Sequence, residues 1–419
     1  MNKRVLLTAV LLSLLSTVSF LSTTYANEPA APKGEKATAA EKLPGDKATI
    51  PAIGDVEAEA RYMWQLFVLS LRPGAGGSLT FEGWPEQCQL NPAMAGCSTA
   101  ALKAGQTRSF HSSALARAFR KNQGKTEATD SGIECSPMQT TALAGYPPPT
   151  NLSKSPVFCE EVFVNNDEAE FVKAKGLTTL NGQLAYAKGS GGGVITFPKT
   201  SLEIKADWVP TSSFSSPTFQ CPDPTNKLYT ETINGTCYAL VGLHISSKAL
   251  PDWIWATFEP ASTVTNPNRC DPKLYSTCFD PWGTTSKTPY GKGTTVPQSP
   301  QLVSLMNAYG LNKAFGNYYL TGAQTQFVNA QGKAIPLGSS FVEFNAGVLP
   351  GQASCITCHK YAYFDGKPQS PENNFGGPPN GWPAIGYACN TSQKANCTPL
   401  VPGSISQDFS WMLGLMPVK

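Results

Sequence analysis

The chain has 419 residues, a formal net charge of +3 and only 15% charged residues. This balance excludes the basic surface of a nucleic-acid-binding protein and that of a protein bound to anionic membranes. Glycine and proline number 37 and 35, which predicts many turns and few long helices.

The chain begins with the layout of a secretory signal. A positive start precedes the apolar run 5–21, and small residues around a bulkier one end it at 24–26. We therefore expect a signal peptide over 1–26, with an uncleaved anchor helix as the alternative. Residues 27–50 have no apolar periodicity and are interpreted as a disordered leader. Export predicts a periplasmic or secreted protein, of a Gram-negative bacterium, with no membrane span after cleavage.

The remaining pattern predicts an α+β fold, mainly antiparallel β-structure with a few helices and long disulfide-tied loops. Helices are expected over 54–73, which Pro73 ends, and over 301–315. Asn234-Gly235 between two strand-like runs predicts a hairpin. Further strand-like runs are 160–165, 193–198, 201–209, 252–260, 317–328 and 339–347. We assign 51–419 to one large domain and 280–300 to one of its loops.

The twelve cysteines divide into two groups. Ten of them fall into sequential neighbours, and an oxidising compartment favours local disulfides between these, although connectivity does not follow from sequence alone. The expected pairs are Cys88/Cys97, Cys135/Cys159, Cys221/Cys237, Cys270/Cys278 and Cys389/Cys397. Bridges over such short loops are expected to pin irregular segments rather than to replace a core.

Cys355 and Cys358 differ from the rest because His359 follows them directly. C-x-x-C-H is the attachment motif of haem c, in which two thiols add to the haem vinyl groups and the histidine binds iron. A disulfide, a thioredoxin-like redox pair and a structural zinc site are the alternatives. No βαβ pattern surrounds the motif, and only two other histidines exist to complete a zinc site. The sequence therefore predicts one covalent haem c near the C-terminus.

Several runs together resemble one group of bacterial secreted proteins, described as cytochrome c family proteins. They are MWQLFVLSLRP, LEIKADW, VGLHISSK, WIWATFE, NYYLTGAQTQF, SCITCH and DFSWML, and they cover most of Arg61 to Met412. The resemblance implies a single-haem protein with a large fold and no assigned substrate or partner. In that group a histidine follows the WxWxTFE run; here Pro260 takes its place, so any role of that histidine is absent.

The group opposite His359 would decide the chemistry of the haem. His244 is the first candidate for the sixth ligand or for a distal pocket residue, because strand alternation can aim it at the haem while its two neighbours face the other side. Met416 is the second candidate, together with Met412, and an open site is the third. His111 is expected on an exposed loop.

Aromatic residues near the motif are candidates for the wall of a haem pocket. Tyr361 and Phe364 are the better ones, because they follow His359 directly. Aromatic residues at strand spacing more often belong to an ordinary core, and this is the favoured interpretation of the other candidates, Trp253, Trp255, Phe258 and Tyr363.

These features predict a periplasmic c-type cytochrome that transfers electrons to a redox partner of unknown identity. The alternative is a haem enzyme of the peroxidase or oxygenase kind, with an open or His-lined distal site. A third reading is a non-redox binding protein whose C-x-x-C is a disulfide.

Overall fold

The computed structural model describes residues 49–91, 135–138, 148, 152–189, 194–216, 219–261, 268–273, 277–333, 335–346, 353–360, 362–364, 405–414 and 416–417. All of these belong to one compact unit, Ala48–Lys419. The predicted signal peptide lies outside the described residues, as do nearly all of the leader, His111, Tyr361, Cys97, Cys389 and Cys397.

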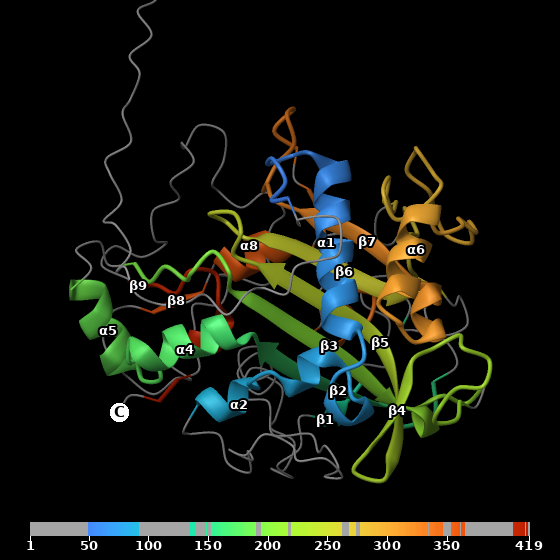
Figure 1. Ribbon diagram of the computed structural model, residues 1–419, viewed down its shortest axis with the longest axis horizontal. Coiled ribbons are helices and arrows are strands. Elements are labelled where there is room, and N and C mark those ends of the chain that lie inside the picture. Colours follow the sequence, from blue (N-terminus) through green and yellow to red (C-terminus); the bar gives the residue numbers. More distant parts are fainter. Residues whose placement is uncertain are drawn as a thin grey trace, which may run out of the picture. The chain divides into compact units, whose positions relative to one another are not determined.

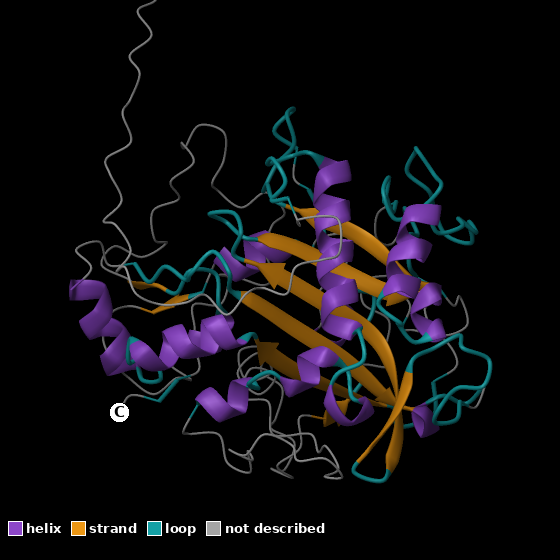
Figure 2. Ribbon diagram, in the orientation of Figure 1, coloured by secondary structure: helices purple, strands orange, loops and turns teal. Residues whose placement is uncertain are grey.

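One antiparallel sheet of seven strands forms the centre of the described structure (Figures 1 and 2). Six strands follow the order β1-β2-β3-β5-β6-β7, and β4 pairs with the start of β5. Every pair in the sheet is antiparallel, so the predicted α+β fold with mainly antiparallel strands is confirmed. The strands are β1 Cys135–Pro137, β2 Val157–Val164, β3 Leu202–Pro210, β4 Thr230–Ile233, β5 Thr236–Ser247, β6 Ile254–Pro260 and β7 Tyr318–Gln324.

The helices are short, apart from α1, which spans Val56–Leu71. The others are α2 Gln87–Leu90, α4 Asn166–Ala174, α5 Leu180–Gly189, α6 Pro300–Ala308, α7 Val342–Ala346, α8 Cys355–Lys360 and α10 Trp411–Gly414. The described residues also include the 3-10 turns Ala75–Gly77, Thr80–Gly83, Thr211–Ser213 and Lys313–Asn317, and the small pair β8 Tyr363–Phe364 and β9 Ile405–Ser406.

Helix α1 packs on the face of the sheet that we call the apolar face (Figure 1). Asp55 caps the helix by accepting from the Ala58 N–H at 3.1 Å, as expected for an N-cap aspartate. The ring of Phe258 on β6 lies 4.9 Å from Trp64 and 4.6 Å from Phe67, centroid to centroid. Burying rings of this size contributes about 1.5–3 kcal/mol each, so this contact holds the helix on the sheet.

The opposite face of the sheet carries polar side chains on three neighbouring strands, and we call it the polar face. Lys205 of β3 is paired in register with His244 of β5, which is paired with Thr257 of β6. Leu243 and Ile245, on either side of His244, belong to the core with α1. The alternation expected around His244 is therefore present.

The predicted hairpin at Asn234-Gly235 is confirmed. Both residues have positive φ, at 47° and 77°, which a two-residue turn between β4 and β5 requires. The disulfides Cys135–Cys159, Cys221–Cys237 and Cys270–Cys278 are formed. Cys88 is also disulfide-bonded, and the other expected pairings involve cysteines outside the described residues.

Two of the predicted strands are wrong in the described residues. Residues 194–198 have no place in the central sheet, because the N–H groups of Ile195 and Phe197 bond to Ser406 O and to the Asp408 carboxylate. In the run 339–347 the structure has helix α7. A turn precedes this helix, in which Ser339 Oγ accepts from the Phe341 N–H at 3.2 Å.

The second predicted helix is shorter than expected. It ends at Ala308, and Gly310 follows with a φ of +64°, a backbone conformation that ends helices. None of the helices in the described part of the chain is both long enough and apolar enough to span a bilayer.

Candidate functional site

Helix α8, Cys355–Lys360, carries both cysteines of the motif. Gln324 of β7 anchors its first turn, because Oε1 accepts from the Ile356 N–H at 3.1 Å. Ile356 is fully buried beside the sheet. Cys355 and Cys358 are three residues apart, which puts them on one side of a helix. Both are free cysteines and do not form a disulfide with one another.

His359 is oriented by the backbone. Its Nδ1 lies 2.8 Å from the carbonyl oxygen of Phe409, and a carbonyl only accepts hydrogen bonds, so Nδ1 carries the ring proton and Nε2 keeps a free lone pair. The Trp255 ring lies 4.3 Å from the imidazole, centroid to centroid. Burial lowers the pKa of His359 to about 3, which keeps the ring neutral at physiological pH. A neutral imidazole held through Nδ1 can bind a metal ion through Nε2.

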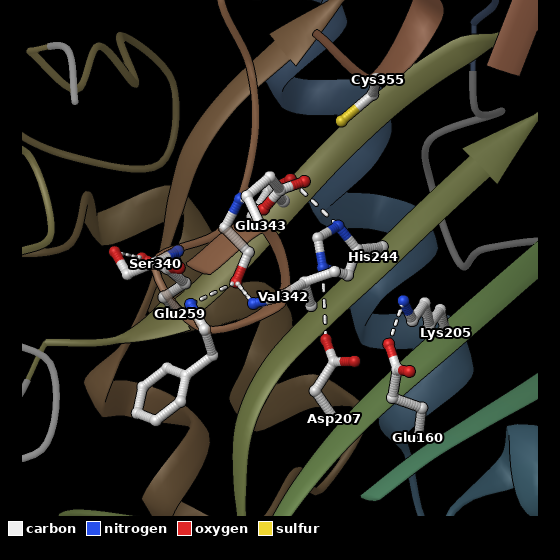
Figure 3. A network of polar contacts seen from close by, with 12 residues as sticks. Glu160, Lys205, Asp207, His244, Glu259, Ser340, Val342, Glu343 and Cys355 are labelled. Atoms are coloured by element: carbon white, nitrogen blue, oxygen red, sulfur yellow. Dashed lines mark hydrogen bonds and ion pairs between the residues drawn. The ribbon is translucent and has the colours of Figure 1, made fainter. Parts of the chain in front are cut away.

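His244 lies on the polar face with a partner at each ring nitrogen (Figure 3). Nδ1 is 3.2 Å from Thr257 Oγ1, and Nε2 is 3.2 Å from Asp207 Oδ2. The Asp207 side chain is completely buried and that of His244 is 16% exposed. Burial alone would lower the pKa of His244, but the Asp207 carboxylate outweighs this and raises it.

Gly242 leaves the space that the Asp207 carboxylate occupies. It is paired with Asp207 across β3 and β5. A Cβ at position 242 would lie 2.8 Å from Asp207 Oδ2, closer than a carbon atom approaches in real structures. A glycine at this position therefore leaves room for the carboxylate in the place from which it contacts His244.

Further charges surround this pair. Lys205 forms an ion pair with Glu160 of β2, and although burial opposes it, the Glu160 and Asp207 carboxylates raise the pKa of Lys205. Glu343 of α7 accepts from the Ser339 N–H. Burial raises the pKa of Glu343 to about 7, against the opposing effect of His244. Both the protonated and the ionised form of Glu343 are therefore populated near neutral pH.

The thiols of α8 belong to the same environment. Burial, and after it the Glu343 carboxylate, raises the pKa of Cys355 well above its usual range. The same two causes raise the pKa of Cys358 to about 12. Thiol–disulfide exchange needs a thiolate, so these protonated thiols are poorly suited to the chemistry of a thioredoxin-like pair.

The two methionine candidates lie in an apolar cluster on the α8 side of the sheet. Met412 of α10 is 2% exposed and Met416 is fully buried. The cluster also contains Trp253, Trp255 and Ile356, and Cys355 packs against it. Met412 and Met416 are therefore core residues that share a cluster with the motif.

The candidate pocket aromatics separate between the two faces. Trp253 and Trp255 lie in the cluster that contacts Cys355. Phe258 does not, because it packs against Trp64 in the core on the apolar face, as the ordinary-core interpretation of these aromatics predicts. Tyr363 and Phe364 form β8, which pairs with β9, and the side chain of Phe364 lies outside the described residues.

Three residues of the candidate site belong to no sequence motif that would mark them as functional. They are Asp207, Thr257 and Phe409, and each acts through a contact with a segment distant in the chain. Phe409 contributes only its carbonyl oxygen, which a pattern of side chains cannot reveal. Strand alternation could have put Asp207 on the polar face, but not beside His244.

Among the described residues, no three His, Cys, Asp or Glu side chains form a group that could hold a metal ion. No family model matches the chain, and neither a curated protein nor a solved structure is significantly similar to it.

Proposed function

We propose that the chain is an exported c-type cytochrome, which carries one haem on Cys355 and Cys358, uses His359 as an axial ligand, and transfers electrons. The observation that carries the proposal is the state of His359: Nδ1–H donates to the Phe409 carbonyl, and Nε2 is left unprotonated next to two free cysteines. A histidine that binds iron in a protein is commonly oriented in this way, through its other nitrogen.

The residues present fit the group. The two free thiols on α8 could each add to one vinyl group of a haem, and the imidazole that follows them has a lone pair to offer the iron. The haem would supply the one-electron change between Fe(III) and Fe(II). The chain would supply the covalent hold, the orientation of His359 and a buried environment, which tunes the reduction potential.

Export is part of the proposal. The secretory layout of 1–26 and the disulfides Cys135–Cys159, Cys221–Cys237 and Cys270–Cys278 fit an oxidising compartment. The resemblance of seven sequence runs to bacterial cytochrome c family proteins supports the same assignment.

We propose His244 as the first candidate for the sixth ligand and Met416 as the second. Ligation through His244 requires one nitrogen to leave Thr257 or Asp207, and the remaining contact would then orient the ring. Ligation through Met416 requires it to leave a fully buried position.

A haem enzyme is the second candidate function, because the partly buried His244 is paired with the completely buried Asp207 on the side of Cys355. If neither His244 nor a methionine binds iron, this pair could take up and return a proton for the peroxide or oxygen chemistry that the haem would supply.

Visible spectroscopy tests both. The full chain is exported together with a cytochrome c maturation system, and spectra are recorded in the oxidised and reduced states. A low-spin spectrum that cyanide and carbon monoxide leave unchanged supports electron transfer. A high-spin spectrum that responds to peroxide supports the enzyme, and a purified protein without haem rejects both. His244→Ala and Met416→Leu are the matched variants: whichever one turns low-spin into high-spin identifies the ligand.

A further inference from the structure

The carbonyl that holds His359 is presented by an unusual turn. Asp408 and Phe409 follow one another with φ values of 52° and 68°, in the left-handed region that side chains disfavour. Each such residue costs of the order of 1–2 kcal/mol. A turn of this kind persists only when its surroundings hold it, so the contacts of Asp408 are informative.

Both carboxylate oxygens of Asp408 are held at 2.7 Å. Oδ1 contacts Lys248 Nζ, and Oδ2 accepts from the backbone N–H of Phe197. Lys248 Nζ also donates to the Pro251 carbonyl at 2.6 Å. The side chains of Lys248 and Asp408 are only 6% and 8% exposed, so the ion pair is screened little by solvent.

Lys248 joins the turn to the end of strand β5 in the central sheet. It directly follows β5, and its N–H donates to Ser201 O at 3.0 Å. Its partner Asp408 is 160 residues away in the chain. Replacing a buried ion pair by apolar residues is often neutral for stability. The geometry that the pair fixes therefore explains it better than a contribution to stability.

We propose that Lys248 and Asp408 are positioning residues for His359: their ion pair holds the turn at 408–409, so that the Phe409 carbonyl keeps the Nδ1–H of His359 and leaves Nε2 as the nitrogen that would bind the iron. This inference rests on the proposed function. A hydrogen bond from Nδ1–H makes Nε2 a more basic ligand, which favours Fe(III) and lowers the reduction potential.

The decisive variant is Lys248→Met/Asp408→Asn in the haem-loaded full chain. A single substitution would change the charge near the haem and move the potential by electrostatics alone, whereas the double variant removes one positive and one negative charge. Lys292→Met/Asp271→Asn is the matched control, because it removes an ion pair of 3.2 Å in another loop. Lys248→Arg keeps the charge and should behave like the wild type.

Two readouts separate positioning from a merely structural role. At a fixed applied potential, the Lys248/Asp408 double variant should show about a tenfold higher ratio of reduced to oxidised protein, which is 59 mV for one electron. In the reduced protein, the NMR signal of the His359 Nδ1 proton should exchange faster with solvent. An unchanged potential and unchanged exchange, with or without a lower Tm, would overturn the proposal.

Failure of the proposed function gives a different result. If the purified chain holds no haem, the Nδ1 proton of His359 is followed in the haem-free chain. Faster exchange in the Lys248/Asp408 double variant but not in the Lys292/Asp271 control then still supports the positioning role, and equal exchange rejects it.

Discussion

Asp280 links the loop at 280–300 to helix α1, and replacing it by asparagine should change stability in a way that depends on pH. Its Oδ2 accepts from Trp64 Nε1 and its Oδ1 from the Gly283 N–H, both at 2.7 Å. Gly283 is packed so closely that a Cβ there would lie 2.0 Å from Trp64 Nε1. The carboxyl group is fully buried, and loss of hydration disfavours its charged form.

The magnitude follows from the pKa. Burial raises the pKa of Asp280 to about 6, compared with about 3.9 in an unfolded chain. Because the folded protein binds this proton more tightly, the stability that the proton contributes is fully present below pH 3.9 or so. It is lost as pH rises through about 6, and two pH units correspond to roughly 3 kcal/mol.

Asp280→Asn removes this pH dependence at the cost of hydrogen bonds. The amide oxygen can accept from only one of the two donors, and leaving one buried donor without its hydrogen bond costs roughly 1–3 kcal/mol. We expect the free energy of unfolding of the variant to lie below that of the wild type at pH 4. The gap should close by roughly 2 kcal/mol between pH 4 and pH 7, since only the wild type must bury a charge at the higher pH and the unfolded carboxyl is already about half ionised at pH 4.

Urea unfolding followed by circular dichroism, with disulfides intact, measures this difference. Groups common to both proteins cancel in the subtraction. Asp271→Asn is the control in the same region; Asp271 contacts the partly exposed Lys292, so we expect a loss within about 1 kcal/mol at pH 7. A gap between wild type and Asp280→Asn that stays constant from pH 4 to pH 7 would refute the reasoning.

Three further predictions concern the polar face and the loops. Gly242→Ala should lower the free energy of unfolding by about 1–3 kcal/mol, because the new Cβ meets Asp207 Oδ2 at 2.8 Å; the double variant with Asp207→Ala should recover most of that loss in urea titrations. His244→Ala leaves the buried Asp207 carboxylate without its partner and should lower the free energy of unfolding by about 3–5 kcal/mol. Adding Asp207→Ala should restore part of this loss, and a double variant that is less stable than His244→Ala alone would contradict this pairing. Cys270→Ser/Cys278→Ser opens a loop with a sequence separation of 8 and should lower Tm through a loss of roughly 2–3 kcal/mol, whereas an unchanged Tm would mean that the bridge does not constrain the loop.

Local signals predicted much of the fold. The apolar period of α1, the Asn234-Gly235 turn and the alternation around His244 each depend on neighbours in the chain, and the structure has them where they were expected. The same is true of three disulfides between sequential cysteines. Short-range patterns are informative wherever the final contact is also short-range.

The failures have a tertiary cause. Ile195 and Phe197 look like strand residues, but their N–H groups bond to a segment more than 200 residues later. The Glu343 carboxylate accepts from the Ser339 N–H in the turn before α7, whereas the β-branched and aromatic residues between them favoured a strand in our prediction.

The motif of the candidate site was visible in the sequence, and the residues that support it were not. Cys355, Cys358 and His359 are recognisable because one motif holds all three. The Phe409 carbonyl, the Lys248–Asp408 ion pair and the His244–Asp207 pair join residues from separate segments. Their meeting depends on strand order and register, which a single sequence does not encode in any local pattern.

Mass spectrometry of the peptide that contains Cys355–Lys360 tests the central claim most directly. The full chain is exported with a cytochrome c maturation system, denatured, extracted with acidic organic solvent and digested. We predict that this peptide keeps the mass of one haem bound through both sulfurs, and that Cys355→Ser/Cys358→Ser loses it completely. A wild-type peptide with two unmodified thiols, or with a disulfide between Cys355 and Cys358, would contradict the account.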